Sequence, residues 1–258
     1  MSHILLVRHG QASFLEGDYD KLRANGETQA SLLGKYWARR GVLFNNAYSG
    51  PRLRQRETAR IVAREYRNAG IGFPETVVMS EFDEYHAEAV LRECLPQLLQ
   101  KNAEIRELRD AYEKSLEASE SGDSHESGLD DGSESISNDR RKTFQRLFEA
   151  VIGKWVAGEV AAPGIGSWAD FTLRVERGLS QIVRDTPPAA RVVIFTSAGA
   201  IGAAVGRALH LSGADMLQVT WMSRNSSISE FLASGERFTL STFNSHPHLD
   251  GDGLLTYR

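Results

Sequence analysis

Two apolar runs in the sequence show no alternation with polar positions. They lie at 4–7 (ILLV) and within 191–195 (RVVIF). Continuous β-branched runs of this length are typical of strands buried on both faces of a parallel sheet. The segments 46–49 (NAYS) and 76–79 (TVVM) are weaker strand candidates.

Helical periodicity separates these strand candidates. Apolar side chains recur at helical spacing within 26–41 and within 54–66,. The two stripes consist of Ala30, Leu33 and Trp37, and of Thr58, Ile61, Val62 and Tyr66. Strand, helix, strand and helix in this order predict βαβ crossovers and a parallel sheet. Near the end of the chain, 227–243 holds two alternating runs around a Ser-Gly pair, which predict an antiparallel hairpin at one edge of the sheet,.

The middle of the chain has a different pattern. Helical spacing of apolar residues covers 86–118 and 141–158, and a further helix is predicted to begin at Ser167,. Between the first two lies 115–139, with eight acidic residues, eight serines and no Lys or Arg. Because this composition buries little apolar surface, the sequence predicts a mobile acidic loop there.

The predicted architecture is an α/β three-layer sandwich with a mostly parallel central sheet and helices on both faces. We expect a single domain over 1–258 that carries a helical insertion at about 86–165, with the loop at 115–139 inside it. The insertion is expected to cap the carboxyl ends of the strands.

Composition narrows the class of protein. The hydrophobic fraction of 41% and the charged fraction of 25% are typical of globular proteins,. The net charge of -4 argues against a nucleic-acid partner, and the longest apolar window is too interrupted for a membrane span,. A single cysteine, Cys94, and no signal-peptide pattern lead us to expect a cytoplasmic protein,. Subtracting the charge of -8 in 115–139 from -4 leaves +4 on the remainder, which suits an anionic ligand,.

The first candidate site follows the first strand, where Arg8, His9 and Gly10 stand in sequence. The carboxyl end of a parallel strand is where open α/β sheets bind ligands. The second candidate is 48–59 (YSGPRLRQRETA), in which a strand gives way to a helix that opens with several arginines. A helix N-terminus attracts anions, so arginines in its first turn are misplaced unless an anion lies there.

The chain resembles the histidine phosphatase superfamily, with its phosphoglycerate mutase-like fold, in these two motifs. The segments 22–34 and 242–258 are also similar to bacterial members. The resemblance implies that His9 attacks phosphorus and forms a phosphohistidine, while Arg8 and Arg54 bind the phosphoryl oxygens. It implies no metal and no cofactor, because the arginines supply the charge stabilisation. Gly10 would admit the phosphate close to the backbone, and Gln11 and Ser13 would be minor donors.

A general acid must protonate the leaving alcohol. In the family this acid is a glutamate after the next strand, and the resemblance places it at Glu81. Asp83 and Glu84 are close competitors, and Glu84 is the second choice.

The strand at 191–195 ends in Ser197, Ala198 and Gly199, whereas family members typically have Ser-His-Gly there. Three interpretations stay open. The site could still turn over, with Ser197, the Gly199 amide and both arginines, or with a histidine from elsewhere such as His248. The site could bind phosphate compounds without turnover, or the alanine could be an engineered substitution. Losing one donor costs about 10²–10³ in rate, so we favour a slow or specialised phosphatase.

Other functions remain as alternatives. Phosphoglycerate mutases carry a Glu-Ser and a Trp-Asn segment after Arg-His-Gly that this chain lacks, so a mutase is less favoured. A metal hydrolase built on His246, His248, Asp250 and Asp252, and a dinucleotide site at 199–206, are both weak hypotheses,. The expected partner is a small phosphorylated substrate or inorganic phosphate, with no nucleic acid and no membrane. The sequence leaves a homodimer open.

Overall fold

The computed structural model describes residues 1–13, 20–122, 131–251 and 253–257. The chain divides into two compact units. The sheet unit comprises Met1–Tyr85 and Asp170–Arg258, and the helical unit comprises His86–Ala169. None of the helices in the described ranges is both long and apolar enough to cross a membrane.

In the described residues, the sheet unit contains one sheet of six strands in the order β3-β2-β4-β1-β5-β6. The strands are β1 (Ser2–Arg8), β2 (Asn46–Ser49), β3 (Thr76–Val78), β4 (Arg191–Thr196), β5 (Ile228–Ser234) and β6 (Arg237–Ser245). The first four in the spatial order are parallel, and β5 and β6 form the predicted antiparallel hairpin. Arg8 pairs with Thr196, and Ser49 pairs with Phe195. The three central strands β1, β4 and β2 therefore end at one level, which brings the residues that follow them together.

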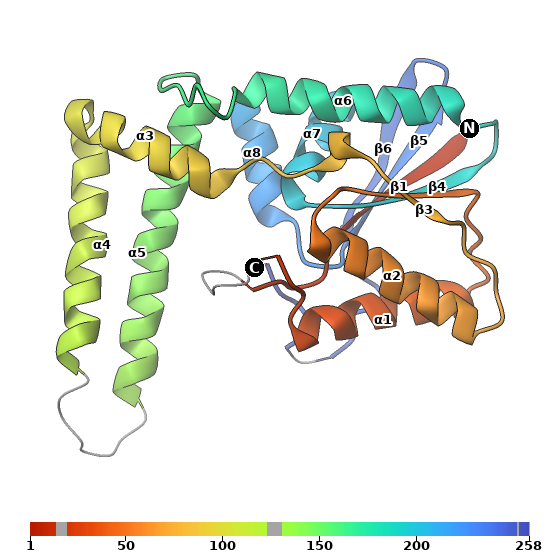
Figure 1. Cartoon of the computed structure of the whole chain (residues 1–258), viewed down its shortest axis with the longest axis horizontal. Helices are drawn as coiled ribbons and strands as arrows, with labels where there is room; N and C mark the ends of the chain where they lie inside the picture. Colours follow the sequence, from red (N-terminus) through yellow and green to blue (C-terminus); the bar gives the residue numbers. More distant parts are fainter. Residues whose placement is uncertain (14–19, 123–130, 252, 258) are drawn as a thin grey trace. The chain divides into compact units, whose positions relative to one another are not determined.

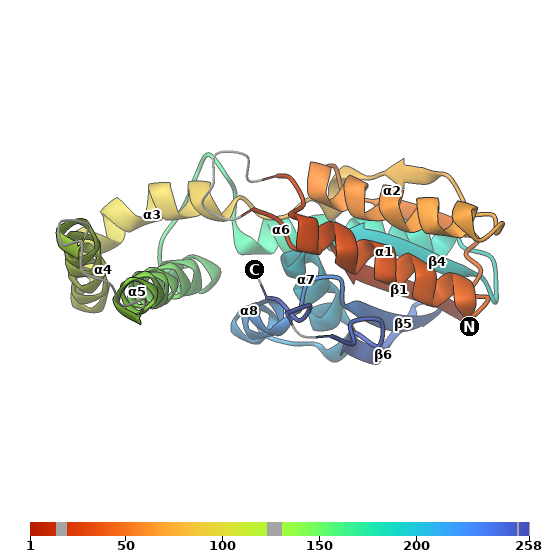
Figure 2. The same ribbon diagram turned by 90° about the horizontal axis from the view of Figure 1, so that it is seen from below.

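Helices cover both faces of this sheet, as predicted (Figure 1). On one face lie α1 (Ala24–Arg39) and α2 (Leu53–Asn68), which pack against each other. On the other face lie α6 (Trp168–Asp185) and α7 (Ala198–Leu209), with α8 (Gly213–Met222) beside α7. Figure 2 shows the same layers from below, with α1 in front of β1. The expected three-layer α/β sandwich is confirmed for this unit.

The core between the sheet and the first helix pair contains the predicted helical stripes. Leu33 and Trp37 of α1, and Val62 and Tyr66 of α2, are buried against side chains of β1 and β4. The Tyr66 hydroxyl donates a 2.7 Å hydrogen bond to the Val42 carbonyl, so even its polar atom is satisfied. Full burial of side chains this large stabilises by about 1.5–3 kcal/mol each. This packing fixes the N-terminus of α2 beside the strand ends.

The helical unit consists of α3 (Ala87–Lys101), α4 (Ala103–Gly122) and α5 (Asp131–Val156). Helices α4 and α5 pack against each other along their length. Their buried apolar residues include Ile105, Phe148, Val151 and Ile152. Trp155 meets Trp168 edge to face, with ring centroids 5.9 Å apart.

The prediction of a loop over 115–139 is wrong at both of its ends. Helix α4 continues to Gly122 and α5 already begins at Asp131, while 123–130 lie outside the described residues. Composition alone underestimated the helix content of this segment, because each helix is stabilised by its neighbour and tertiary packing overrides local preference. The segment also contains Glu, Ala and Leu, which are good helix formers,.

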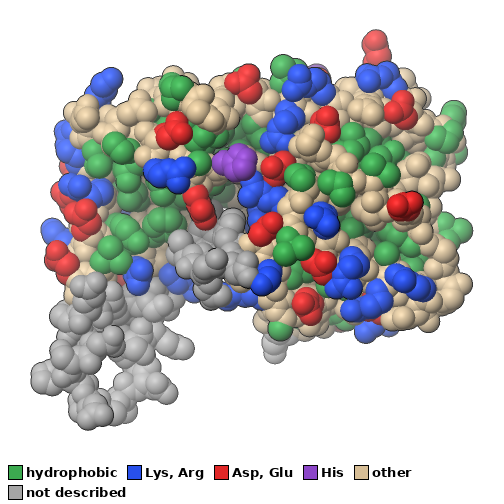
Figure 3. Space-filling model, viewed as in Figure 1, with side chains coloured by type: hydrophobic (Ala, Val, Ile, Leu, Met, Phe, Trp, Pro, Cys, Tyr) green, Lys and Arg blue, Asp and Glu red, His purple; other side chains and the backbone are tan. Residues whose placement is uncertain are grey.

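Charged side chains of both signs are interspersed on the face of the molecule drawn in Figure 3. Among the side chains shown in colour there, Lys and Arg lie next to Asp and Glu. The net positive charge expected outside 115–139 is therefore not concentrated in one broad basic surface on that face.

Candidate active site

His9 lies directly after β1 and is only 6% exposed. Its backbone amide continues the ladder by donating to the Thr196 carbonyl at 2.9 Å. Its ring Nδ1 lies 2.7 Å from the Gly10 carbonyl oxygen, and its Nε2 accepts from Arg54 Nε at 3.1 Å. Because a carbonyl can only accept, the ring proton belongs on Nδ1. The Nε2 atom therefore carries the free electron pair of a neutral imidazole.

The surroundings of His9 favour this neutral form. Burial lowers the pKa of His9 well below its usual value, and the positive charges of Arg54 and Arg8 lower it further. The hydrogen bond to the Gly10 carbonyl acts in the opposite direction and is the weaker influence. A buried imidazole between two guanidinium groups is thus unprotonated at neutral pH, which a nucleophile requires.

Arg54 is the second residue of α2 and is 3% exposed. Besides its contact with His9, its Nη1 forms a 2.9 Å ion pair with Asp20 Oδ1. The other carboxylate oxygen of Asp20 accepts from the Leu53 amide, the first of α2, at 2.7 Å. The structure thus brings His9 and Arg54 together, 45 positions apart in the chain. The sequence did not reveal Asp20, because nothing local links it to a helix that begins at residue 53.

Arg8 is also buried, at 8% exposure, and its Nη1 donates to the Ser223 carbonyl just after α8. Its charge lowers the pKa of His9, as the charge of Arg54 does, so the imidazole lies in the electrostatic field of both predicted arginines. The Arg52 side chain, by contrast, extends to Asp83, with a distance of 2.6 Å from its Nε to Oδ1.

The turn after His9 is held by contacts within the protein. The Gly10 amide donates to Thr58 Oγ1 at 3.1 Å, and the Gln11 amide donates to Gln29 Oε1 at 2.8 Å. The Ser13 amide donates to the Lys21 carbonyl at 3.1 Å. The backbone amides of these three residues, which the sequence assigned to phosphate binding, are thus engaged in bonds to other protein atoms.

Gly10 has a packing role that the sequence did not predict. A Cβ on Gly10 would lie 2.3 Å from the carbonyl oxygen of Gly26, and a Cβ on Gly26 would lie 2.1 Å from the carbonyl oxygen of Gln11. Both glycines are therefore needed for the first turn of α1 to approach the strand end. This close approach explains the glycine in Arg-His-Gly without invoking a ligand.

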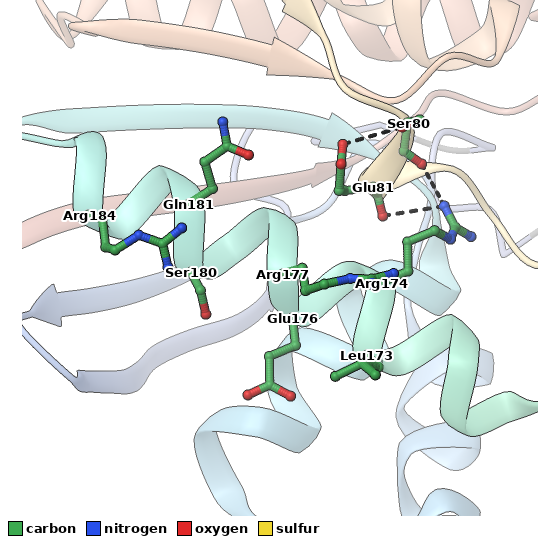
Figure 4. Close-up of a pocket in the computed structure, with 9 residues that line it drawn as sticks. All are labelled: Ser80, Glu81, Leu173, Arg174, Glu176, Arg177, Ser180, Gln181 and Arg184. Carbon is green, nitrogen blue, oxygen red and sulfur yellow. Dashed lines mark hydrogen bonds between the residues drawn. The ribbon is translucent and has the colours of Figure 1, made fainter.

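The structure does not bring Glu81 to His9. Glu81 lies in the short 3-10 turn η1 (Ser80–Phe82), and a Cβ placed on Gly178 of α6 would lie 2.6 Å from the Glu81 Cβ. Figure 4 shows Glu81 and Ser80 at one side of a surface groove whose other lining residues all come from α6. The groove has a volume of about 730 Å³. Glu81, the first choice for the general acid, therefore lines this groove beside α6.

Glu84, the second choice, points toward the strand ends. Its Oε2 accepts from the Gly199 amide at 2.9 Å, and its Oε1 accepts from the Tyr85 amide at 3.0 Å. Burial raises the pKa of Glu84, against the opposing influence of these two amides and of Arg54. The direction of this shift is the one that a proton donor requires.

Two arginines hold the loop that carries Glu84. Arg52 Nη2 donates to the Glu84 carbonyl at 3.3 Å and, through Nε, binds the Asp83 carboxylate. Arg174 of α6 donates to the carbonyl oxygens of Ser80 and Asp83, at 2.5 and 3.1 Å (Figure 4 shows the first contact). Asp83, the third acidic candidate, is thus committed to Arg52.

At the end of β4, Ser197 is the N-cap residue of α7 and is 1% exposed. Its Oγ accepts from Gln55 Nε2 at 2.8 Å. Ala198 is buried, and the Gly199 amide is bonded to Glu84. A Cβ on Gly199 would lie 2.1 Å from Glu84 Oε1, so the glycine makes room for that carboxylate. Ser197 and Gly199 are therefore held by Gln55 of α2 and by Glu84.

His248 does not stand beside Ala198. Its Nε2 lies 3.0 Å from Ser226 Oγ, and its ring centroid lies 6.2 Å from that of Tyr36 in α1. Burial is the main reason that its pKa falls to about 4. The Ser226 amide in turn donates to the His9 carbonyl, so Ser226 connects His248 to the backbone of His9. Among the described residues no three His, Cys, Asp or Glu side chains are grouped as a metal site would require.

Comparison with known proteins identifies the family of the chain. The family model of the histidine phosphatase superfamily (branch 1) matches residues 4–130 and 132–246, and the chain belongs to that superfamily. Membership in this superfamily supports phosphoryl transfer as the general class of chemistry. No curated protein sequence matches the chain.

Several solved structures share the fold. A phosphoserine phosphatase from Entamoeba histolytica, in complex with 3-phosphoglyceric acid, is 18% identical, with a TM-score of 0.59 over 96% of this chain and 100% of that one. A mycobacterial glucosyl-3-phosphoglycerate phosphatase is 18% identical, with a TM-score of 0.57 over 94% and 98% of the two chains. A phosphoglycerate mutase from Bacillus anthracis is 14% identical, with a TM-score of 0.57 over 96% and 94%.

Proposed function

We propose that the protein is a metal-independent phosphatase that hydrolyses a phosphate monoester through a phosphohistidine on His9. The observation that carries the proposal is the fixed tautomer of His9, with Nδ1 on the Gly10 carbonyl and Nε2 toward Arg54. An imidazole held in this way can present a lone pair to an electrophile without prior loss of a proton. The neighbouring guanidinium groups match the geometry of a phosphoryl group.

In the first step, His9 Nε2 forms a bond to phosphorus while the bond from phosphorus to the ester oxygen breaks. Arg54 and Arg8 stabilise the charge on the three remaining oxygens. Glu84 transfers its proton to the departing alkoxide, which leaves as an alcohol. In the second step, Glu84 takes a proton from water, the water oxygen attacks phosphorus, and the N–P bond breaks. Inorganic phosphate leaves, and His9 and protonated Glu84 are restored.

Ala198 favours a second candidate, a member that binds phosphate compounds without useful turnover. Removal of one preorganised donor costs about 10²–10³ in rate. Enzymes accelerate phosphate-monoester hydrolysis by many more powers of ten, so this loss slows the reaction and does not end it. We therefore rank the phosphatase above the binding protein.

The test measures release of p-nitrophenol from p-nitrophenyl phosphate, with and without EDTA. Wild type is expected to turn over equally in both, and His9→Ala is expected to lose the activity. His210→Asn is a matched control, because His210 is an exposed histidine at the far end of α7. Acid-labile label from a ³²P-labelled substrate should appear on His9 in wild type. If wild type hydrolyses no member of a broad phosphate-ester panel, the catalytic proposal is wrong and the binding protein remains.

A further inference from the structure

The Asp20 carboxylate accepts hydrogen bonds from a guanidinium group and from a helix amide near His9. Oδ1 contacts Arg54 Nη1 at 2.9 Å, and Oδ2 contacts the Leu53 amide at 2.7 Å. A guanidinium group and the first amide of a helix are the donors that an oxyanion normally uses. In this structure an anion that belongs to the chain itself occupies both.

The two partners differ in their access to solvent. The side chain of Asp20 is 42% exposed, whereas that of Arg54 is 4% exposed. Asp20 can therefore turn into water at small cost, while Arg54 must remain in the site. An incoming phosphate group that replaces Asp20 gives Arg54 a doubly charged partner in exchange for a singly charged one.

Arg54 Nε donates a hydrogen bond to His9 Nε2, so the lone pair that would attack phosphorus is engaged in this bond. While Asp20 holds Nη1, the guanidinium group lies between the carboxylate and the imidazole. A phosphoryl group that binds Nη1 in place of Asp20 would draw the guanidinium group toward itself and free His9 Nε2.

We propose that Asp20 is an internal competitor of the phosphoryl group, which is bound to Arg54 and Leu53 in the empty site and is displaced by substrate. This inference rests on the proposed function, since it takes Arg54 as a phosphate-binding residue. The same competition acts after hydrolysis, when Asp20 returns to Arg54 and helps to expel inorganic phosphate. Asp20 thus lowers the affinity for product.

The experiment is calorimetric titration of orthophosphate into wild type and Asp20→Asn. Asparagine keeps an oxygen for the Leu53 amide and is as good at helix N-termini as aspartate, so the variant should fold. Its neutral side chain competes less, and we expect the dissociation constant for orthophosphate to fall about tenfold. Asp185→Asn removes the same charge at an exposed position at the end of α6 and should change nothing.

The outcomes separate this inference from the proposed function. A dissociation constant in Asp20→Asn that equals or exceeds the wild-type value overturns the competitor role. If wild type binds orthophosphate, Arg54→Gln abolishes binding and Asp20→Asn matches wild type, the phosphate site stands and only this inference fails. If neither wild type nor Asp20→Asn binds orthophosphate, the phosphate site and the inference fail together. A purely structural role for Asp20 predicts weaker binding, never tighter.

Discussion

The Glu84 carboxylate accepts a hydrogen bond from the backbone amide of Gly199, with 2.9 Å between Oε2 and the nitrogen. Gly199 follows Ala198, the position at which the family resemblance leads us to expect a histidine. The carboxyl group therefore lies at the N-terminal turn of α7 that the sequence assigned to phosphate binding. This contact connects the acid-bearing loop after β3 to the end of β4 within one unit of the chain.

Replacement of Glu84 by glutamine should slow hydrolysis of an alkyl phosphate by about 10²–10³, because the leaving alkoxide loses its proton donor. The effect should be smaller for p-nitrophenyl phosphate, whose leaving group needs little protonation. Steady-state kcat on both substrates measures the difference. Glu81→Gln is the matched control and should stay within about twofold of wild type, since Glu81 packs against α6. A larger loss in Glu81→Gln than in Glu84→Gln would show that the acid has been misassigned.

The pH profile of kcat/KM should reflect the shifted pKa values of His9 and Glu84. The pKa of His9 is lowered, so the nucleophile remains neutral well below pH 6.5 and the acid limb should lie at low pH,. Burial raises the pKa of Glu84, and the proton donor is lost as the pH rises through this raised pKa. Activity should therefore fall on the alkaline side in wild type, and this limb should flatten in Glu84→Gln. Comparison of the two proteins on one substrate cancels the ionisation of the substrate itself. An identical alkaline limb in both would contradict the assignment.

Arg174→Gln should lower kcat about tenfold, because it releases the carbonyl oxygens of Ser80 and Asp83 and lets the Glu84 loop shift,. KM should change little, since Arg174 is not a phosphate ligand in this scheme. The pH profile should also show a displaced alkaline limb. Arg177→Gln removes a neighbouring arginine that lines the same groove and serves as the control (Figure 4). Equal effects of the two substitutions would indicate a general charge effect instead of a positioning role.

Gly26→Ala should destabilise the fold by about 3 kcal/mol, because the new methyl group would meet the backbone of Gln11 at 2.1 Å,. The strand end and the first turn of α1 would have to move apart, so activity should fall as well. Denaturant unfolding measures the loss of stability. Gly72→Ala is the control, because a Cβ there has nothing within 4 Å. Near-equal stability of the two variants would contradict the close approach at Gly26.

His248 should make the fold sensitive to acid. Its pKa is about 4 in the folded chain, against 6.5 for an ordinary histidine, chiefly because it is buried. The unfolded state therefore binds a proton first, and stability is full above pH 6.5 and falls as the pH drops toward 4. The shift corresponds to about 3 kcal/mol. His248→Gln should remove this part of the pH dependence in unfolding experiments at pH 7 and pH 4. An unchanged slope would show that other groups, such as His9, account for it.

The sequence predicted the strands and the helices between them, because continuous apolar runs and helical stripes are local signals. His9 and Arg54 could be found from motifs whose positions on a parallel sheet bring them together. The sequence could not decide between Glu81 and Glu84 as the general acid. The direction of each side chain depends on the short helix η1 and on the contacts of this loop with Arg52 and Arg174. The reach of α4 and α5 into 115–139 was missed for a related reason, since it depends on pairing between the two helices.

The backbone of His9 is bound on both sides. Its amide is tied to Thr196, and its carbonyl oxygen accepts from the Ser226 amide and from Asn225 Nδ2 at 3.2 and 3.3 Å. With the ring also bonded to the Gly10 carbonyl, the position of the imidazole at the end of β1 is fixed. Whatever rearrangement accompanies a reaction cycle must then be carried by side chains that surround it, above all the rotation of one guanidinium plane. Snapshots with and without an oxyanion should superimpose along β1 and differ in the torsion angles of Arg54.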